Sequence, residues 1–345
     1  MNEPPTARPL AERFWDMVTT GRERSAVAAA AEALEAGTAP EDLLLGVIGA
    51  VQDRIGREWA ADRITVVQEH VATAVSERVI AALAHHPAWP VPADAPADRR
   101  VTVACAEGEW HALPARLVAE VLRLNGWEVD YLGAHVPARY LAVHLRRTRP
   151  DALALSASLA GRLPAAHRAI AAAADLGVPV LAGGPAFGPG GRYALLLDAG
   201  GWAPDARAAA AWLEKGAGGG RAPERGVRTP PPAVEEYALL ARTAGRLERD
   251  AYAAMAARFP DRTEQDFEWI DFLIESLAAA LYVDDPDLFT GCAGWAAGVL
   301  AARGAAAEVP LAALEVLGGA LTDFPRASAL IAEARLSLSL GPPAP

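Results

Sequence analysis

One short segment brings a carboxylate and an imidazole together at a spacing that suits metal ligation. Residues 106–114 read A-E-G-E-W-H-A-L-P, so that Glu109 stands two positions before His111. The segment follows the apolar run 101–105, which has the composition of a buried strand. Metal-binding histidines usually donate their second ring N–H to a carboxylate, and Glu109 is placed to accept it. An ordinary polar loop histidine would have the same sequence, so the pair alone leaves both interpretations open.

Small and hydroxylated residues follow two further strand-like runs. Ser156 and Ser158 end one run, and Gly183 and Gly184 end the next. Ligands of doubly wound sheets bind at the carboxyl ends of the strands. Small residues there would let an elongated ligand enter between strands, and hydroxyls could donate hydrogen bonds to it. Simple turn chemistry is the alternative explanation. No G-x-G-x-x-G, G-x-S-x-G or P-loop pattern accompanies them, which argues against a dinucleotide site.

The elements that must position these residues fall into three blocks. Residues 10–86 have apolar residues at helical spacing and predict about four helices, the number of a small bundle; Thr38 is a candidate N-cap there. Residues 100–214 alternate β-like and helical runs in five βα units, which predicts a doubly wound, flavodoxin-like parallel sheet. The five β-like runs are VTVACA, WEVDYLG, DALALSAS, VPVLAGG and ALLLDAG. After a Gly- and Pro-rich linker at 215–232, residues 233–340 show only helical periodicity and predict an all-α domain.

Composition excludes several classes of protein. The 345 residues carry 32 basic and 43 acidic side chains, and the net charge of −11 disfavours a general nucleic-acid binder or a polybasic membrane surface. Two cysteines form neither a disulfide framework nor a zinc cluster, and they suit a reducing compartment. No run approaches the ~20 apolar residues of a membrane span, and the first residues lack a secretory pattern. We therefore expect a multidomain cytoplasmic protein without a membrane or direct DNA partner.

Taken in order, the motifs of the second block resemble those of the cobalamin-binding Rossmann-like family. They are E-x-H after the first strand, G-x-x-x-P at Gly133–Pro137, serine after the third strand and paired glycines after the fourth. The resemblance implies that His111 is the lower axial ligand of cobalt and replaces the cofactor's own base. It also implies that the displaced nucleotide tail passes four small residues, Ser156, Ser158, Gly183 and Gly184. A four-helix cap precedes the sheet in that family, which residues 10–86 would supply.

The chain also departs from the family pattern at three positions. Glu109 stands where the family has an aspartate, and Pro114 stands where it has a glycine. The leucine of the family's S-x-L element falls one place late, at Leu159. These departures concern the tail pocket more than the cobalt ligand.

The first block contains a W-x9-E-H arrangement formed by Trp59, Glu69 and His70. Val66, Glu69 and His70 fall on one helix face, as positions i, i+3 and i+4 do. The arrangement resembles the light-sensing subclass of CarH-type photoreceptors. That resemblance implies that Trp59 and Glu69 enclose the 5′-deoxyadenosyl group of adenosylcobalamin, with Val66 lining the pocket. It further implies that His70 becomes a second cobalt ligand after photolysis. An exposed Glu-His pair beside a core tryptophan is the alternative.

Three functions then compete. A corrinoid carrier for methyl transfer must open its upper face to a methyl donor, and Trp59 and His70 would hinder that. A light-controlled repressor has a DNA-binding helix-turn-helix before the cap, where this sequence has few residues, and the negative charge also disfavours it. We therefore expect a photoreceptor and not an enzyme, in which photolysis changes conformation and oligomeric state. The resemblance predicts a homo-oligomer, and the downstream effector is not identified by any motif.

The third block predicts a globin-like domain. Haem ligation by histidine is excluded there, because the last histidine is His167. A linear tetrapyrrole would need apolar walls and a cation for its carboxylates; Arg262 or Arg303 could supply the cation. The aromatic residues at helical spacing are Trp269, Phe272, Tyr282, Phe289 and Trp295. The combination resembles the photocobilins and predicts biliverdin as a second chromophore, although an ordinary core has the same pattern. Cys292 could tether a bilin, and a buried structural thiol is the favoured interpretation.

Overall fold

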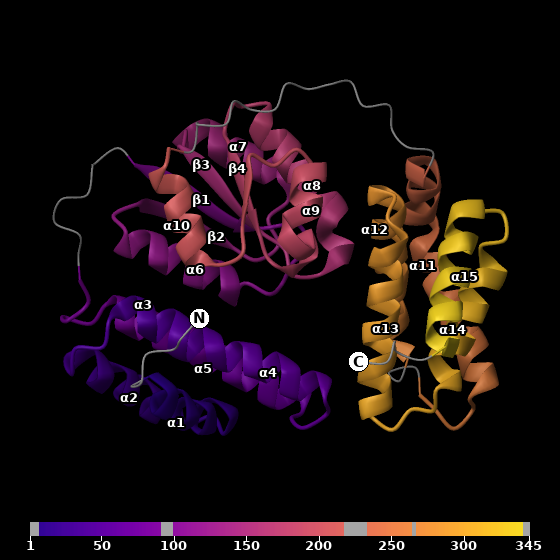
Figure 1. Ribbon diagram of the computed structural model, residues 1–345, viewed down its shortest axis with the longest axis horizontal. Coiled ribbons are helices and arrows are strands. Elements are labelled where there is room, and N and C mark those ends of the chain that lie inside the picture. The colour runs from indigo at the N-terminus through magenta and orange to yellow at the C-terminus, as the bar shows by residue number, and fades with distance from the viewer. Residues whose placement is uncertain (1–6, 91–98, 217–232, 264–266, 341–345) are drawn as a thin grey trace. The chain divides into compact units, whose positions relative to one another are not determined.

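The computed structural model describes residues 7–90, 99–216, 233–263 and 267–340. Most of the predicted linker 215–232 lies outside these residues, as does the stretch 91–98. The described chain forms two compact units. The first contains an N-terminal helical domain followed by a sheet domain, and the second contains helices α11 to α15 (Figure 1).

The helical domain contains the four predicted helices. They are α1 (Ala7–Thr19), α2 (Glu23–Glu35), a third helix made of α3 (Pro40–Asp42), the π-helical segment Leu43–Gly49 and α4 (Ala50–Ala60), and α5 (Val66–Ala84). Buried Phe14, Leu44 and Ile80 are part of their core. The prediction that Thr38 caps the third helix is wrong. Ala39 occupies the N-cap position in an extended conformation without a side-chain cap, and Pro40 begins the helix, as its fixed φ allows.

The sheet domain has the predicted flavodoxin-like topology. Its parallel strands are β1 (Arg100–Cys105), β2 (Glu128–Gly133), β3 (Ala152–Ser156), β4 (Val180–Gly183) and β5 (Gly201–Ala203), in the order β2-β1-β3-β4-β5. The helices between and after them are α6 (Leu113–Leu124), α7 (Ala138–Thr148), α8 (Leu163–Ala174), α9 (Arg192–Leu196) and α10 (Ala206–Glu214). Figure 1 shows α6 and α10 on one side of the strands and α8 and α9 on the other. Every strand end that carries a predicted site residue therefore opens onto one edge.

The fifth strand does not lie where the sequence predicts it. The run ALLLDAG was expected to form a strand, but its first residues belong to α9, and β5 starts only at Gly201. Alanine and leucine are strong helix formers, whereas strands favour β-branched and aromatic residues. The real strand, G-W-A, has three residues and is too short to show a period of two.

The helical and sheet domains of the first unit share one hydrophobic core. The core cluster runs from Phe14 and Leu44 of the helical domain to Leu122 of α6. A Cβ placed on Gly49 would lie 3.6 Å from Leu117 Cδ1, so the π-helical segment packs closely on α6. Arg207 of α10 also pairs with Glu41 and Asp42 of α3. The sheet thus carries the helical domain on its α6 and α10 side.

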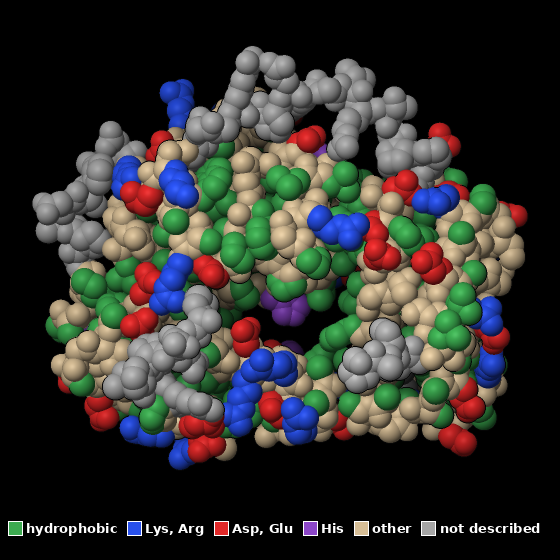
Figure 2. Space-filling view, viewed as in Figure 1, with side chains coloured by type: hydrophobic (Ala, Val, Ile, Leu, Met, Phe, Trp, Pro, Cys, Tyr) green, Lys and Arg blue, Asp and Glu red, His purple; other side chains and the backbone are tan. Residues whose placement is uncertain are grey.

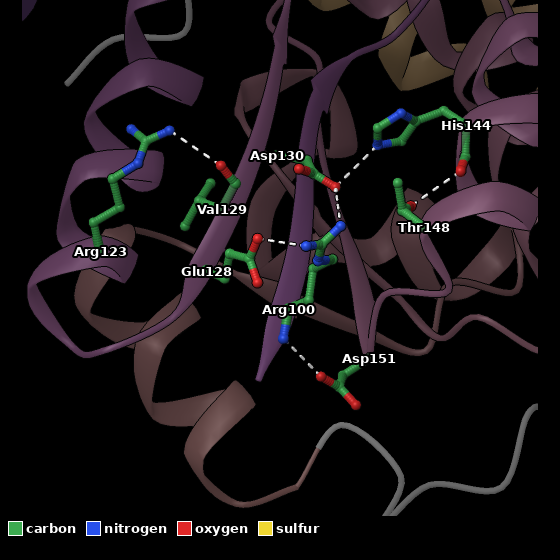
Figure 3. Close-up of polar contacts among 8 residues, drawn as sticks. All are labelled: Arg100, Arg123, Glu128, Val129, Asp130, His144, Thr148 and Asp151. Atoms are coloured by element: carbon green, nitrogen blue, oxygen red, sulfur yellow. Dashed lines mark hydrogen bonds and ion pairs between the residues drawn. The ribbon is translucent and has the colours of Figure 1, made fainter. Parts of the chain in front are cut away.

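Charged side chains of the edge strand β2 form polar contacts with the strand and the helix next to it (Figure 3). Arg100 of β1 pairs with Glu128, and one of its guanidinium nitrogens lies 3.7 Å from Asp130 Oδ2. His144 Nε2 of α7 lies 3.2 Å from the same oxygen. The Arg100 N–H donates to Asp151 Oδ2 at 2.8 Å. Charge on an edge strand discourages pairing with another chain, which is the main value of partly exposed ion pairs like these.

The second unit is all-helical, as predicted. Its helices are α11 (Ala233–Arg258), α12 (Trp269–Val283), α13 (Pro286–Ala302), α14 (Glu308–Ala320) and α15 (Pro325–Leu340). Fully buried Phe267, Leu277 and Leu314 are among their core residues. In the part of the chain that the structure describes, every helix is too short or too polar to cross a bilayer.

We predict that Gly191→Ala destabilises the sheet domain more than Gly190→Ala. Both glycines have a left-handed φ, +73° and +63°, so alanine costs about 1 kcal/mol of strain at either position. A Cβ on Gly191 would lie 2.2 Å from Trp202 Cγ of β5, whereas a Cβ on Gly190 has no atom within 4 Å. Overpacking should add about 1–3 kcal/mol to the loss at Gly191. Urea unfolding measures both, and equal losses would show that Trp202 does not pack on this turn.

Candidate functional site

The predicted lower-face residues meet at the carboxyl edge of the central strands. Cys105 at the end of β1 is in register with Ser156 of β3, and Ser156 is in register with Gly183 of β4. The Ala106 N–H donates to the Ser156 carbonyl at 3.0 Å. The E-x-H loop, the serines and the paired glycines therefore form one cluster, although they are far apart in the sequence.

Glu109 is the centre of this cluster. Its side chain is fully buried. Oε1 accepts a hydrogen bond from the His111 backbone N–H at 2.8 Å and lies 2.6 Å from His111 Nδ1. Oε2 accepts from the Ser158 N–H at 2.6 Å. One carboxylate thus joins the loop after β1 to the loop after β3, and the predicted contact between Glu109 and His111 is present.

These contacts set the protonation of the pair. Burial by itself would raise the pKa of Glu109, but the hydrogen bonds from His111 and Ser158 outweigh it and lower the pKa. An ionised carboxylate can only accept, so the proton between the two side chains belongs to His111 Nδ1. Nε2 is then the ring nitrogen that can ligate a metal. The His111 side chain is 55% exposed, so a ligand can reach it.

Two neighbouring acidic groups do not compete with His111 as ligands. Burial, followed by the charge of Glu109, raises the pKa of Cys105 to about 12. Burial likewise raises the pKa of Tyr131 to about 12, and its hydroxyl donates to the Ala112 carbonyl at 3.1 Å. Since the thiolate is the ligating form of cysteine, Cys105 is a structural thiol at neutral pH. Of these three side chains, the His111 imidazole is therefore the one that could ligate a metal at neutral pH.

The glycine pair packs backbone to backbone against the serine loop. Gly184 has φ +102°, and a Cβ on it would lie 2.3 Å from the Ala157 carbonyl oxygen. The Ala157 N–H donates to the Gly183 carbonyl at 3.0 Å, and the Ala186 N–H donates to the Ala157 carbonyl at 3.2 Å. Any other residue at 184 would push these loops apart. The edge between β3 and β4 is therefore lined by backbone and small side chains.

The predicted upper-face residues lie on the helical domain. His70 Nδ1 is 2.6 Å from Glu69 Oε2 and 2.8 Å from the Val66 carbonyl oxygen. The Thr73 hydroxyl donates to Glu69 Oε1 at 3.1 Å, so this carboxylate is held from both sides. The side chain of His70 is 73% exposed, and Val66 is 52% exposed although it is apolar. Trp59 of α4 is half-buried against the shared core.

The two groups belong to facing domains of the first unit. Figure 2 shows histidine side chains where the sheet domain faces the helical domain. A ligand that contacted both groups would lie between these two domains. The structure thus brings the lower residues into one cluster and the upper residues into another, each on its own domain.

Sequence reasoning missed two residues of the site. Trp110 of the E-x-H loop stacks on His135, with ring centroids 4.9 Å apart and planes 7° apart. His135 lies inside the segment Gly133–Pro137 that the family pattern already marked, and this was the one available signal. The contact itself depends on how the loops after β1 and β2 meet, which no local pattern encodes.

The residues proposed for a bilin have mixed surroundings within the second unit. Phe289 is fully buried and is an ordinary core residue. Trp295 is 48% exposed and its ring lies 5.2 Å from that of Phe272. Tyr282 packs edge-on against Tyr237 at 4.8 Å. Burial raises the pKa of Cys292, which makes this thiol a weak nucleophile for a covalent tether. Biliverdin stays a prediction.

Comparisons with known proteins find matches for both domains of the first unit. Residues 99–211 match a family model described as a B12 binding domain, and residues 10–84 match a second model with the same description. The HTH-type transcriptional repressor CarA of Myxococcus xanthus is 30% identical over 157 residues, which are 45% of this chain and 50% of that protein. The chain therefore spans about half the length of this relative.

A solved structure shows the same fold. The monomethylamine corrinoid protein of Methanosarcina barkeri superposes with a TM-score of 0.52 and 17% identity, covering 60% of this chain and 98% of that one. At this identity the likeness concerns the fold alone.

We predict that Glu109→Gln lowers stability at neutral pH and that the loss fades in acid. The lowered pKa of Glu109 means that its ionised form stabilises the fold. That contribution is complete above the ordinary glutamate pKa of about 4.3 and is lost as the pH falls through the lower folded value. Hydrogen bonds to a charged group are worth about 1.5–3 kcal/mol, which is the expected loss at pH 7. Urea unfolding at pH 7 and pH 3 measures it.

Glu107→Gln is the matched control in the same loop. Glu107 is partly exposed, and its carboxylate lies 3.4 Å from Arg168, so its loss should be under 1 kcal/mol. A loss at Glu109 that did not change with pH would mean that its ionised state is not what stabilises the loop.

Proposed function

The chain carries two B12-binding domains, at 10–84 and 99–211, and from this premise we propose that it is a light sensor that holds adenosylcobalamin between them. The observation that carries the proposal is the buried Glu109 carboxylate 2.6 Å from Nδ1 of His111, a contact that would direct Nε2 of the ring toward cobalt. When bound, the cofactor supplies a cobalt–carbon bond that light can break. The residues of the chain would bind the cofactor and enclose its adenosyl group.

The lower face would bind the cofactor through the sheet domain. His111 would ligate cobalt through Nε2, and the Glu109 carboxylate would raise the basicity of the ring and fix its orientation. The nucleotide tail would lie along Ser156, Ser158, Gly183 and Gly184. The Cβ clash at Gly184 supports this, because a larger residue would close the edge of the sheet between β3 and β4.

The upper face would enclose the adenosyl group through the helical domain. Trp59 and Glu69 would contact it, and the exposed apolar side chain of Val66 would pack against it. An exposed valine contributes no burial free energy to folding, and a ligand that covered it would gain that free energy on binding. After photolysis His70 would take the upper position on cobalt. The altered contacts of the helical domain would then change the association of the chain with copies of itself.

A corrinoid carrier for methyl transfer is the alternative function. The fold of the monomethylamine corrinoid protein is compatible with either function. The Glu69–His70 pair favours the sensor, because a methyl carrier has no use for a second histidine on the upper face. The similarity to a protein named as a transcriptional repressor also favours regulation over catalysis.

We predict that His111→Ala abolishes ligation from below. The purified chain, reconstituted with adenosylcobalamin in the dark, should show the spectrum of cobalt with a histidine as lower ligand. The variant should lose this spectrum and bind at least 10-fold more weakly. Absorption titration measures both. His144→Ala is the control and should behave as wild type, since His144 lies on α7 and contacts Asp130 of β2.

A second experiment tests the response of the reconstituted protein to light. Spectra and light-scattering masses are compared before and after green light, with biliverdin added in a second series. A sensor should change both spectrum and mass, whereas an unchanged protein that accepts methyl groups would support the carrier.

We predict that His70→Ala changes the photoproduct and leaves dark binding within about 2-fold of wild type. In the dark the adenosyl group would occupy the position that His70 takes after light, so the His70 imidazole would not be a ligand there. After light, wild type should show the spectrum of histidine on both faces, and the variant should show histidine on the lower face alone. His85→Ala, at the exposed end of α5, is the control. The same photoproduct in all three proteins would show that His70 is only a surface residue.

A further inference from the structure

His135 adopts a backbone conformation that its residue type disfavours. It lies between the end of β2 and the start of α7 and has φ +51°. A residue other than glycine with positive φ is uncommon, and it persists only where its surroundings hold it. The contacts of His135 therefore explain why the folded chain tolerates this conformation.

The contacts of this segment go to the end of β1 and the loop after it. His135 Nδ1 accepts a hydrogen bond from the Gly108 N–H at 3.0 Å, and the His135 N–H donates to the Glu109 carbonyl at 2.9 Å. The adjacent Val136 N–H donates to the Cys105 carbonyl at 3.3 Å. The His135 ring stacks on Trp110. One residue thus engages the loop through its backbone, its ring nitrogen and its ring face.

This loop carries the Glu109–His111 pair and has a flexible point of its own. Gly108, directly before Glu109, has φ +82° and no side chain to restrict it. The Glu109 side chain is held from the β3 side by the Ser158 N–H. The Glu109 backbone is held from the β2 side by His135. The carboxylate that orients His111 therefore lies between two braces, and the sequence motifs predicted a site residue in only one of them, Ser158.

We propose that His135 is a positioning residue for the cobalt ligand. It clamps residues 108–110 so that Glu109 presents His111 in one orientation. The proposal rests on the proposed ligation of cobalt by His111. The clamp consists of residues of the chain alone, so it can also be tested on cofactor-free protein.

His135→Gly is the main variant, because it removes the ring contacts with Gly108 and Trp110 without adding strain, while the backbone N–H that donates to the Glu109 carbonyl remains. Glycine accepts a positive φ, so the fold should be retained. His135→Asn is the rescue variant. Asparagine tolerates the left-handed region, and its amide oxygen can accept the Gly108 N–H. Arg149→Gly is the matched control, since Arg149 ends α7 with φ +49° and is relieved of the same strain elsewhere in the domain.

The first measurement is amide hydrogen exchange on the cofactor-free chain. His135→Gly should speed exchange of the Gly108 amide by about 10-fold, because loss of a local brace lowers the free energy of local opening. His135→Asn should restore most of the protection, and Arg149→Gly should leave it unchanged. Equal exchange in wild type and His135→Gly would overturn the clamp.

The second measurement is the cobalamin titration of the same proteins. His135→Gly should bind about 10-fold more weakly and show a smaller fraction of histidine-ligated cobalt, as loss of outer partners of a ligand does. His135→Asn should recover part of both. A stability change with unchanged ligation would reduce His135 to a structural residue and overturn the proposal. If wild type itself lacks the histidine-ligated spectrum, the proposed function fails, and hydrogen exchange then judges the clamp separately.

Discussion

The lower site depends on one buried carboxylate. A charge without water around it is costly unless it is fully hydrogen-bonded. Glu109 meets that requirement with donors from two loops: its own, through His111, and the loop after β3, through Ser158. The same contacts that keep it ionised also fix the His111 tautomer and the distance between the loops. The orientation of the His111 ring and the local stability of the loops therefore have a single origin, and a change that neutralised Glu109 would affect both.

The helical domain is held at one end and exposed at the other. Its π-helical segment and α3 pack on α6 and α10 of the sheet domain, where hydrophobic contacts are reinforced by Arg207. π-helical segments cost hydrogen-bond geometry and are often found at functional positions. The start of α5, with Val66 and His70, is largely exposed. A ligand that bound there would add contacts where the helical domain has fewest, and its loss would remove them.

In the second unit, the spacing of the aromatic residues does not distinguish a hydrophobic core from a chromophore pocket. Aromatic residues at helical spacing serve a core as well as a chromophore pocket, because both bury the same surface. Phe289 belongs to the core, whereas Trp295 is half exposed next to Phe272. The raised pKa of Cys292 further separates its packing role from the reactivity that a tether would need. Only the helical class of this unit follows from its sequence.

Much of the architecture was readable from local patterns. Alternating βα runs predicted the strand order, and the residues after strands one, three and four were expected at one edge because parallel strands share it. The spacing of Val66, Glu69 and His70 predicted their common helix face, and the structure shows the contacts. These successes share a cause, since helical and strand periodicities are set by the burial of neighbouring residues.

Tertiary structure alone decided the features that depend on distant segments. The apolar run after residue 193 became helix α9, and the short edge strand at Trp202 is recognisable only by its pairing with β4. The contact from Gly108 to His135 joins residues 27 positions apart. A strained histidine is stable there because two loops meet around it, and that meeting is a property of the folded sheet. Periodicity reports which face of an element is buried, but not which loop lies against it.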